Sequence, residues 1–198
     1  MPGEKRGMIP NDKYYDKNYN GSWNGLTIIS IAIGQGEVTA TPLQIANLSA
    51  TIANRGYFIT PHVVKEVEDE PLDTLYSNKR YTKVRKEHYE TVVQGMRAAV
   101  TGGTCRAANL PGLDVCGKTG TAQNRGKDHS AFMGFAPMDN PKIAVSVYVE
   151  NGGWGATYGV PIGALIIEKY LNGKLSPQSE VKANDIQMRR IDYGIHER

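Results

Sequence analysis

The feature that most constrains the fold is a run of three strand-like segments in the second half of the chain. They are separated by only a few residues and span residues 113–122, 130–137 and 142–150. Strands that follow one another so closely pair in the antiparallel sense, because a parallel neighbour needs a crossover of a dozen or more residues. The four residues 138–141, Met-Asp-Asn-Pro, have the composition of a tight turn. The sequence therefore predicts an antiparallel sheet of at least three strands.

Helical patterns flank these strands. Apolar residues recur at helical spacing over residues 42–55, 85–100 and 159–171. The first of these helices is predicted to begin with a capping box, in which Thr41 caps, Pro42 takes the first helical position and Gln44 reaches back. Gly56 is predicted to adopt the left-handed conformation that ends it. Helices packed on an antiparallel sheet make an α+β fold, which is the class we expect.

The two ends of the chain lack a comparable pattern. Residues 1–25 are rich in Asn, Tyr, Lys, Asp and Gly, and we expect them to be irregular. Residues 174–198 are polar without a clear period and are predicted to form a loose tail. Short strands broken by a proline are predicted over residues 57–60 and 62–67. We therefore expect one domain over residues 1–173, followed by the tail.

Composition excludes several classes of function. The net charge of +3 is small and dispersed, so a basic nucleic-acid surface is not expected. No apolar run approaches the roughly 20 residues that a membrane helix needs, and the overall composition is typical of a soluble globular protein. Cys105 and Cys116 are the only cysteines. Two cysteines do not build a structural zinc site by themselves, and we expect two buried thiols more than a disulfide.

The most informative stretch is a pentapeptide in the first predicted strand, Gly117-Lys118-Thr119-Gly120-Thr121. Together with Gly112 it matches the phosphate-binding loop G-x-x-x-x-G-K-[ST]. That motif requires a strand before its first glycine and a helix that begins at the lysine. The sequence predicts neither, so a nucleotide-binding function is disfavoured but remains the alternative from another class.

On a strand, the same residues have a different meaning. Alternation places Lys118 and Gly120 on one face and Thr119 and Thr121 on the other. Gly120 has no side chain, so a ligand or another backbone can approach it closely. An edge strand offers unpaired N–H and C=O groups to an extended peptide, and an ammonium with two hydroxyls suits a carboxylate. This interpretation predicts a site for a peptide that carries a carboxylate.

Several separate stretches resemble the class B penicillin-binding proteins, in which Lys-Thr-Gly is the third catalytic motif. They occur in the family's order and are Gly34-Gln35-Gly36 with residues 39–46, then residues 117–123, 129–137, 140–145 and 149–153. The similarity covers about residues 7–172 and is greatest to the elongation-type enzymes. It implies a D-Ala-D-Ala transpeptidase domain that acts without metal or cofactor and takes a peptidoglycan stem peptide or a β-lactam.

The resemblance also implies roles for the motif. Lys118 would belong to the network that handles the proton and the substrate carboxylate, and Thr119 and Thr121 would hold that carboxylate. Gly120 would belong to the same substrate-binding strand. The backbone N–H of Thr121 would supply half of an oxyanion hole, and the nucleophile's own N–H the other half. Gln35 is interpreted as a supporting residue.

The family's nucleophile is the serine of an S-x-x-K motif that precedes Lys-Thr-Gly, and an S-x-N motif completes the proton network. The only S-x-x-K here begins at Ser179, after the motif, and an S-x-N at Ser22 lies too close to the Gly34 segment. Both are interpreted as chance. We therefore expect the chain to be the C-terminal half of the domain and to be inactive by itself.

The same resemblance places the parent protein at the periplasmic face of the inner membrane, working with other cell-wall synthesis proteins. Two further alternatives stay open at this point. One is a β-lactam sensor or β-lactamase-like domain with the same fold, and the other is a module that binds peptides without chemistry.

Overall fold

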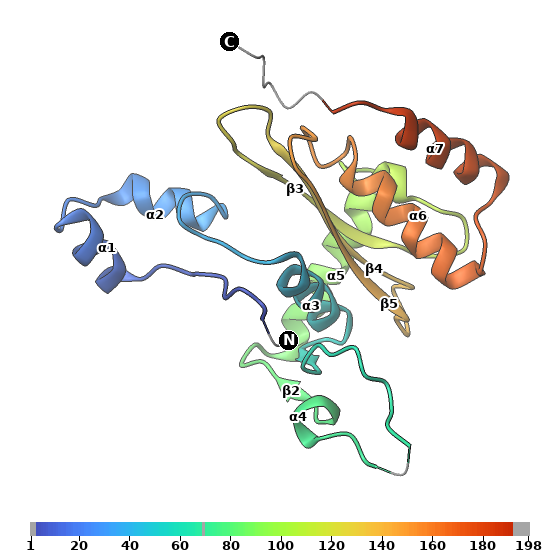
Figure 1. Ribbon diagram of the computed structural model, residues 1–198, viewed down its shortest axis with the longest axis horizontal. Coiled ribbons are helices and arrows are strands. Elements are labelled where there is room, and N and C mark those ends of the chain that lie inside the picture. Colours follow the sequence, from blue (N-terminus) through green and yellow to red (C-terminus); the bar gives the residue numbers. More distant parts are fainter. Residues whose placement is uncertain (1–2, 69, 192–198) are drawn as a thin grey trace.

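The computed structural model of the protein describes residues 3–68 and 70–191. Within these residues, the centre is a three-stranded antiparallel sheet in which β4 lies between β3 and β5 (Figure 1). The strands are β3 (Cys116–Ala122), β4 (His129–Ala136) and β5 (Ile143–Val149). The predicted sheet, its antiparallel pairing and the α+β class are therefore confirmed.

Helices cover both faces of this sheet (Figure 1). On one face, α3 (Pro42–Ala53) packs on β4 and β5, and α5 (Lys86–Thr101) packs on β3. On the other face, α6 (Gly159–Asn172) packs on β4 and β5 and contacts the short 3₁₀ helix η1 (Arg106–Ala108). The three predicted helices are thus confirmed, and the sheet forms the middle of three layers.

Alternation along the strands divides the apolar core between the two faces. Phe132 and Val147 are buried in a cluster with α6, whereas Cys116 and Phe135 are buried in a cluster with α3 and α5. The close approach of α6 requires a glycine, because a Cβ at Gly163 would lie 2.4 Å from the Phe132 ring. The core therefore holds the sheet rigidly from both sides.

The ends of α3 follow the local sequence closely. Thr41 Oγ1 accepts the Gln44 N–H at 3.2 Å, and Gln44 Oε1 accepts the Thr41 N–H at 2.9 Å, so the predicted capping box is confirmed. The prediction for the other end was wrong by one residue. Arg55 adopts the left-handed helical conformation with φ 56°, and Gly56 follows at φ 111°, where a Cβ would meet the Tyr89 ring at 2.9 Å.

The prediction that residues 1–25 are irregular was wrong. They contain α1 (Asp12–Tyr19), and α2 (Gly25–Ala32) begins at the last of them. Asn11 caps α1 by accepting the Tyr14 N–H at 3.0 Å. The helix escaped detection because it is polar on nearly every side, with Tyr15 its only buried residue among those described. Figure 1 shows α1 and α2 beside the body formed by the sheet and its helices.

The prediction of a loose C-terminal tail was also wrong in part. Residues 177–188 form α7 (Pro177–Met188), which packs on α6 and buries Ser179. Ser176 caps this helix by accepting the Ser179 N–H at 3.3 Å. Its own N–H donates at 3.0 Å to the buried Glu168 of α6. Residues 192–198 of the predicted tail lie outside the described part of the chain.

Between α3 and α5 the chain forms only short elements. β1 (Tyr57–Phe58) pairs with β2 (Arg80–Tyr81), and α4 (Thr74–Ser77) precedes β2. The predicted strand over residues 62–67 is absent from the described structure, apart from an isolated bridge at its end. Among the described residues, no helix combines the length and apolar character needed to cross a membrane.

Candidate active site

The Lys-Thr-Gly-Thr motif lies on β3, at the edge of the sheet. Within the described residues, β3 pairs with β4 on one side and with no strand on the other. Lys118 and Thr119 both lie inside the strand, and no helix begins at the lysine. The phosphate-binding loop requires such a helix, so this alternative is contradicted.

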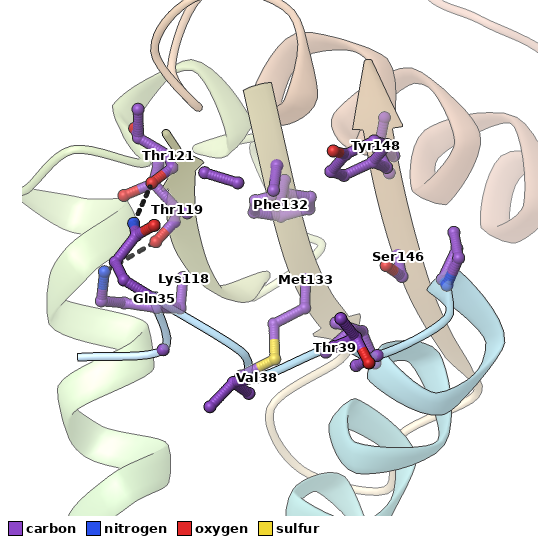
Figure 2. A pocket seen from close by; sticks show the side chains of 18 of the residues that line it. Gln35, Val38, Thr39, Lys118, Thr119, Thr121, Phe132, Met133, Ser146 and Tyr148 are labelled. Carbon is purple, nitrogen blue, oxygen red and sulfur yellow. Dashed lines mark hydrogen bonds between the residues drawn. The ribbon is translucent and has the colours of Figure 1, made fainter. Parts of the chain in front are cut away.

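All four motif residues line one cavity of 590 Å³ on the face of the sheet (Figure 2). The cavity extends from β3 across β4 to β5, and residues 33–35 and 38–40 of the segment before α3 also line it. Figure 2 shows Lys118, Thr119 and Thr121 along one side, with Met133 and Ser146 opposite Val38 and Thr39. The structure thus brings together the site residues predicted from the motif.

The polar groups of the motif already have partners. Lys118 is exposed, and its Nζ donates to the Thr119 carbonyl at 2.7 Å. The hydroxyls of Thr119 and Thr104 lie 2.9 Å apart, and Thr121 Oγ1 accepts the Gly155 N–H at 3.5 Å. Each threonine hydroxyl retains further hydrogen-bonding capacity, because a hydroxyl donates once and accepts twice. The motif therefore combines an exposed ammonium with two oriented hydroxyls.

The chain that follows β5 supports β3 and β4 closely. A Cβ at Gly155 would lie 2.5 Å from the Ala131 carbonyl oxygen and 2.6 Å from that of Gly120. The buried Ser130 donates to the Trp154 carbonyl at 2.8 Å and accepts the Gly159 N–H at 3.0 Å. These contacts fix the position of the motif strand, and they commit the Ser130 hydroxyl to a structural role.

Gln35, which was predicted to be only a supporting residue, reaches the motif directly. Gln35 Nε2 donates to the Thr121 carbonyl at 3.0 Å, and Gln35 Oε1 accepts the Gln123 N–H at 3.4 Å (Figure 2 shows the first bond). The available signal was the Gly34-Gln35-Gly36 segment. The contact could not be predicted from the sequence, because Gln35 and Thr121 are 86 positions apart in the chain.

The segment that carries Gln35 is tied to α1 through a carboxylate. Glu37 accepts hydrogen bonds from the hydroxyls of Tyr15, at 2.7 Å, and Tyr19. The bonds from Tyr19 and Tyr15 lower the pKa of Glu37 below its ordinary value. Burial, together with the bond to Glu37, raises the pKa of Tyr15 to about 12. This cluster therefore ties α1 to the segment that carries Gln35 through a carboxylate that is ionised at neutral pH.

Both cysteines are buried, unpaired thiols, as expected. Burial raises the pKa of Cys116 to about 11 and also raises the pKa of Cys105. A thiol with a raised pKa is a poor nucleophile at neutral pH, so neither cysteine is suited to the chemistry.

The two serine motifs interpreted as chance do not line the cavity of Lys118. Ser179 and Lys182 lie on α7 and line a different cavity, of 210 Å³, between α6, α7 and residues 107–110. Ser22 precedes α2, and Asn24 caps that helix by accepting the Leu26 N–H at 2.9 Å. Within the described residues, the cavity therefore receives no serine from either motif.

A Lys-Thr-Gly-Thr strand at the edge of a helix-covered antiparallel sheet, facing a cavity, defines the class of serine enzymes that recognise penicillin. Within that class, the model of the penicillin binding protein transpeptidase domain matches residues 1–171, and the chain belongs to this family.

Individual relatives agree with this assignment. The chain is 34% identical over 211 residues to the peptidoglycan D,D-transpeptidase MrdA of Haemophilus influenzae, covering 94% of the chain and 32% of that protein. It matches the crystal structure of Pseudomonas aeruginosa PBP2 in complex with WCK 5153 at 35% identity and a TM-score of 0.77, over 90% of this chain and 40% of that one. For PBP2 in its complex with MreC from Helicobacter pylori, the identity is 27% and the TM-score 0.73, over 88% and 32% of the two chains. The chain thus spans about a third of the length of its H. influenzae relative.

Proposed function

We propose that this chain is part of a peptidoglycan D,D-transpeptidase that binds penicillin and cross-links stem peptides by acyl transfer. The observation that carries the proposal is the edge strand β3, on which Lys118, Thr119, Gly120 and Thr121 line one cavity. The family and the name of the H. influenzae relative support the same reaction.

The geometry of β3 suits an acyl-transfer site. The N–H and C=O of one residue in an antiparallel strand point to the same side. Gln35 bonds the Thr121 carbonyl from outside the sheet, so the Thr121 N–H faces the free edge as well. A backbone N–H in that position can donate to the oxygen that becomes negative when a nucleophile attacks the substrate carbonyl. Thr121 thereby supplies half of an oxyanion hole.

The attacking group in this proposal is a serine supplied by a part of the domain outside this chain. Its oxygen bonds to the penultimate D-Ala carbonyl, the terminal D-Ala leaves with a proton, and the acyl group passes to a second stem peptide. Lys118 provides a positive charge for the substrate carboxylate and for the proton network, with Thr119 and Thr121 as hydroxyl donors. Within this chain, the residues described supply recognition, and the missing serine supplies the covalent step.

The setting of the complete protein follows from the same proposal. A cell-wall cross-linking enzyme acts where peptidoglycan is assembled, which for this type of protein is the periplasmic face of the inner membrane. The H. pylori relative was solved with MreC. We expect the complete protein to work with cell-wall synthesis partners of that kind.

The test is covalent labelling of the complete natural protein with a fluorescent penicillin. We expect one label, carried by a serine upstream of residue 1 of this chain, and release of D-Ala when stem-peptide dimers form. A protein that binds without labelling would be a peptide-binding module. A labelled protein that never forms dimers would be a β-lactam sensor or a β-lactamase-like domain. Either result contradicts the proposal.

A further inference from the structure

The Gln35 side chain occupies the edge of β3 in the manner of a neighbouring strand. Its amide bonds both the Thr121 carbonyl and the Gln123 N–H, which lie two positions apart on the same edge. A residue in a parallel neighbouring strand bonds this same pair of groups through its own N–H and C=O. One side chain therefore satisfies both the Thr121 carbonyl and the Gln123 N–H. An added peptide would need these two groups to pair with β3 beyond Thr121.

The backbone around Gln35 holds the amide in this position. Gly34 and Gly36, on either side, have φ 75° and φ 64°, a turn that other residues adopt at a cost. On the far side of the turn, Glu37 is fixed by Tyr15 and Tyr19. The segment is therefore anchored, and the amide is presented to β3 by a built support.

We infer that Gln35 is a positioning residue that ends the peptide-binding edge of β3 at Thr121. By holding the Thr121 carbonyl, it fixes the residue whose N–H forms half of the oxyanion hole. By holding the Gln123 N–H, it prevents a bound peptide from pairing further along the strand. This inference rests on the proposed function for its catalytic part, whereas the capping of the edge concerns this chain in any case.

The first experiment measures acylation of the complete natural protein by fluorescent penicillin, with binding and acylation separated by stopped flow. For Gln35→Leu, which keeps the bulk and removes both hydrogen bonds, we expect the acylation rate constant to fall about tenfold, because a small misplacement of a catalytic group is costly. The dissociation constant of the initial complex changes far less. Gln94→Leu, the same change at an exposed position on α5, is the matched control and stays at the wild-type rate.

Gln35→Glu adds a second measurement, the pH dependence of the acylation rate. A merely structural role of Gln35 would not change this dependence. An ionised glutamate can still accept the Gln123 N–H but cannot donate to the Thr121 carbonyl. The protonated acid can donate again. The acylation rate of Gln35→Glu, divided by that of the wild type at the same pH, is therefore expected to rise as the pH is lowered from about 7 towards the ordinary pKa of a glutamate. A ratio that does not change with pH contradicts the inference.

Amide hydrogen exchange at Gln123 separates the two proposals. We expect slow exchange of the Gln123 N–H in the wild type and much faster exchange in Gln35→Leu, with an unchanged midpoint of thermal unfolding. Rapid exchange in both proteins overturns the capping inference, even if penicillin labels the protein. If the wild type is never labelled but Gln123 is protected only by Gln35, the proposed function fails and the capping of β3 stands. Normal acylation of Gln35→Leu overturns the positioning role and leaves the proposed function intact.

Discussion

At the scale of single residues, the motif on β3 combines one flexible side chain with groups whose positions are fixed. Lys118 presents a flexible cation to the cavity, whereas Thr119 and Thr121 are held by Thr104 and Gly155. A charge on a long side chain adapts to its substrate, and the backbone N–H of Thr121 is fixed by the sheet. Lys118 is therefore the residue whose removal tests the site without disturbing the core.

We expect Lys118→Ala in the complete protein to lower the rate of acylation by penicillin by about 10²–10³, the usual cost of removing one electrostatic contact at an acyl-transfer site. Thermal unfolding should be unaffected, because the side chain is exposed. Labelling with fluorescent penicillin measures the rate. Lys127→Ala is the matched control, since Lys127 is exposed and does not line the cavity. Equal labelling of both variants would remove Lys118 from the site.

The two thiols should be unreactive while the protein is folded. Both cysteines are buried with raised pKa values, about 11 for Cys116, so almost no thiolate exists at neutral pH. Intact-protein mass spectrometry of this chain after treatment with iodoacetamide should find no adduct in buffer. In denaturant it should find two adducts, one for each cysteine. Rapid alkylation of either thiol in buffer would mean that its side of the sheet opens readily.

At the scale of elements, α1 shows how a helix without an apolar face can still be held in place. Its contacts are polar and aromatic: Tyr15 and Tyr19 donate to Glu37, and Trp23 stacks near Tyr15 with ring centroids 5.8 Å apart. The two tyrosine hydrogen bonds depend on the charge of one carboxylate, Glu37, and the Trp23 indole N–H also donates to Asp16 of α1 at 2.8 Å. The position of α1 should therefore respond to pH more than that of α3, α5 or α6.

The lowered pKa of Glu37 gives that response its sign. A carboxyl whose folded pKa lies below its ordinary value of 4.5 stabilises the folded state fully above pH 4.5. This stabilisation is lost as the pH falls below 4.5 through the folded pKa. We expect the Trp23 fluorescence to report a transition in that acidic range, measured with Trp154→Phe as the background.

Glu37→Gln tests the assignment of this transition. The variant keeps a hydrogen-bond acceptor but has no charge to lose, so the acidic transition of α1 should disappear. Glu66→Gln, at an exposed position, should leave it unchanged. A transition that persists in Glu37→Gln would assign it to another carboxylate.

At the scale of the whole molecule, the cavity of Lys118 is bounded by parts of the chain that are distant in sequence. It is lined by β3, β4 and β5 and by the segment before α3. Within the described residues, Ser130 is committed to Trp154 and Gly159, and Ser179 lies at a different cavity. Ser146 does line the cavity, but it lies on strand β5 and is not part of an S-x-x-K motif. Recognition and bond formation are thus expected to come from different parts of the complete domain.

This chain, expressed by itself, should form no covalent adduct with a β-lactam. Acylation needs an activated serine beside a base, and half an oxyanion hole gives recognition without reaction. Intact mass spectrometry after penicillin treatment is the measurement, and the complete protein is the positive control. An added mass that maps to any serine of this chain would show that this chain contains its own nucleophile.

Much of the architecture could be predicted because it depends on patterns among residues that are close in the sequence. Alternation defines β3, β4 and β5, helical spacing defines α3, α5 and α6, and Thr41 with Gln44 defines the start of α3. The Lys-Thr-Gly-Thr motif could likewise be recognised from the sequence, because its residues are neighbours along one strand. In these cases the residues that determine an element are close to one another in the sequence.

Only the tertiary structure decided which distant groups meet. Gln35 and Thr121 are 86 positions apart, and their hydrogen bond depends on how α3 and the sheet pack, which no local period encodes. The same holds for α1, which is hydrogen-bonded to Glu37, and for α7, whose capping Ser176 is bound by Glu168 of α6. Polar contacts leave little hydrophobic pattern in a sequence, because their free energy comes from partners and not from the periodic burial of one face.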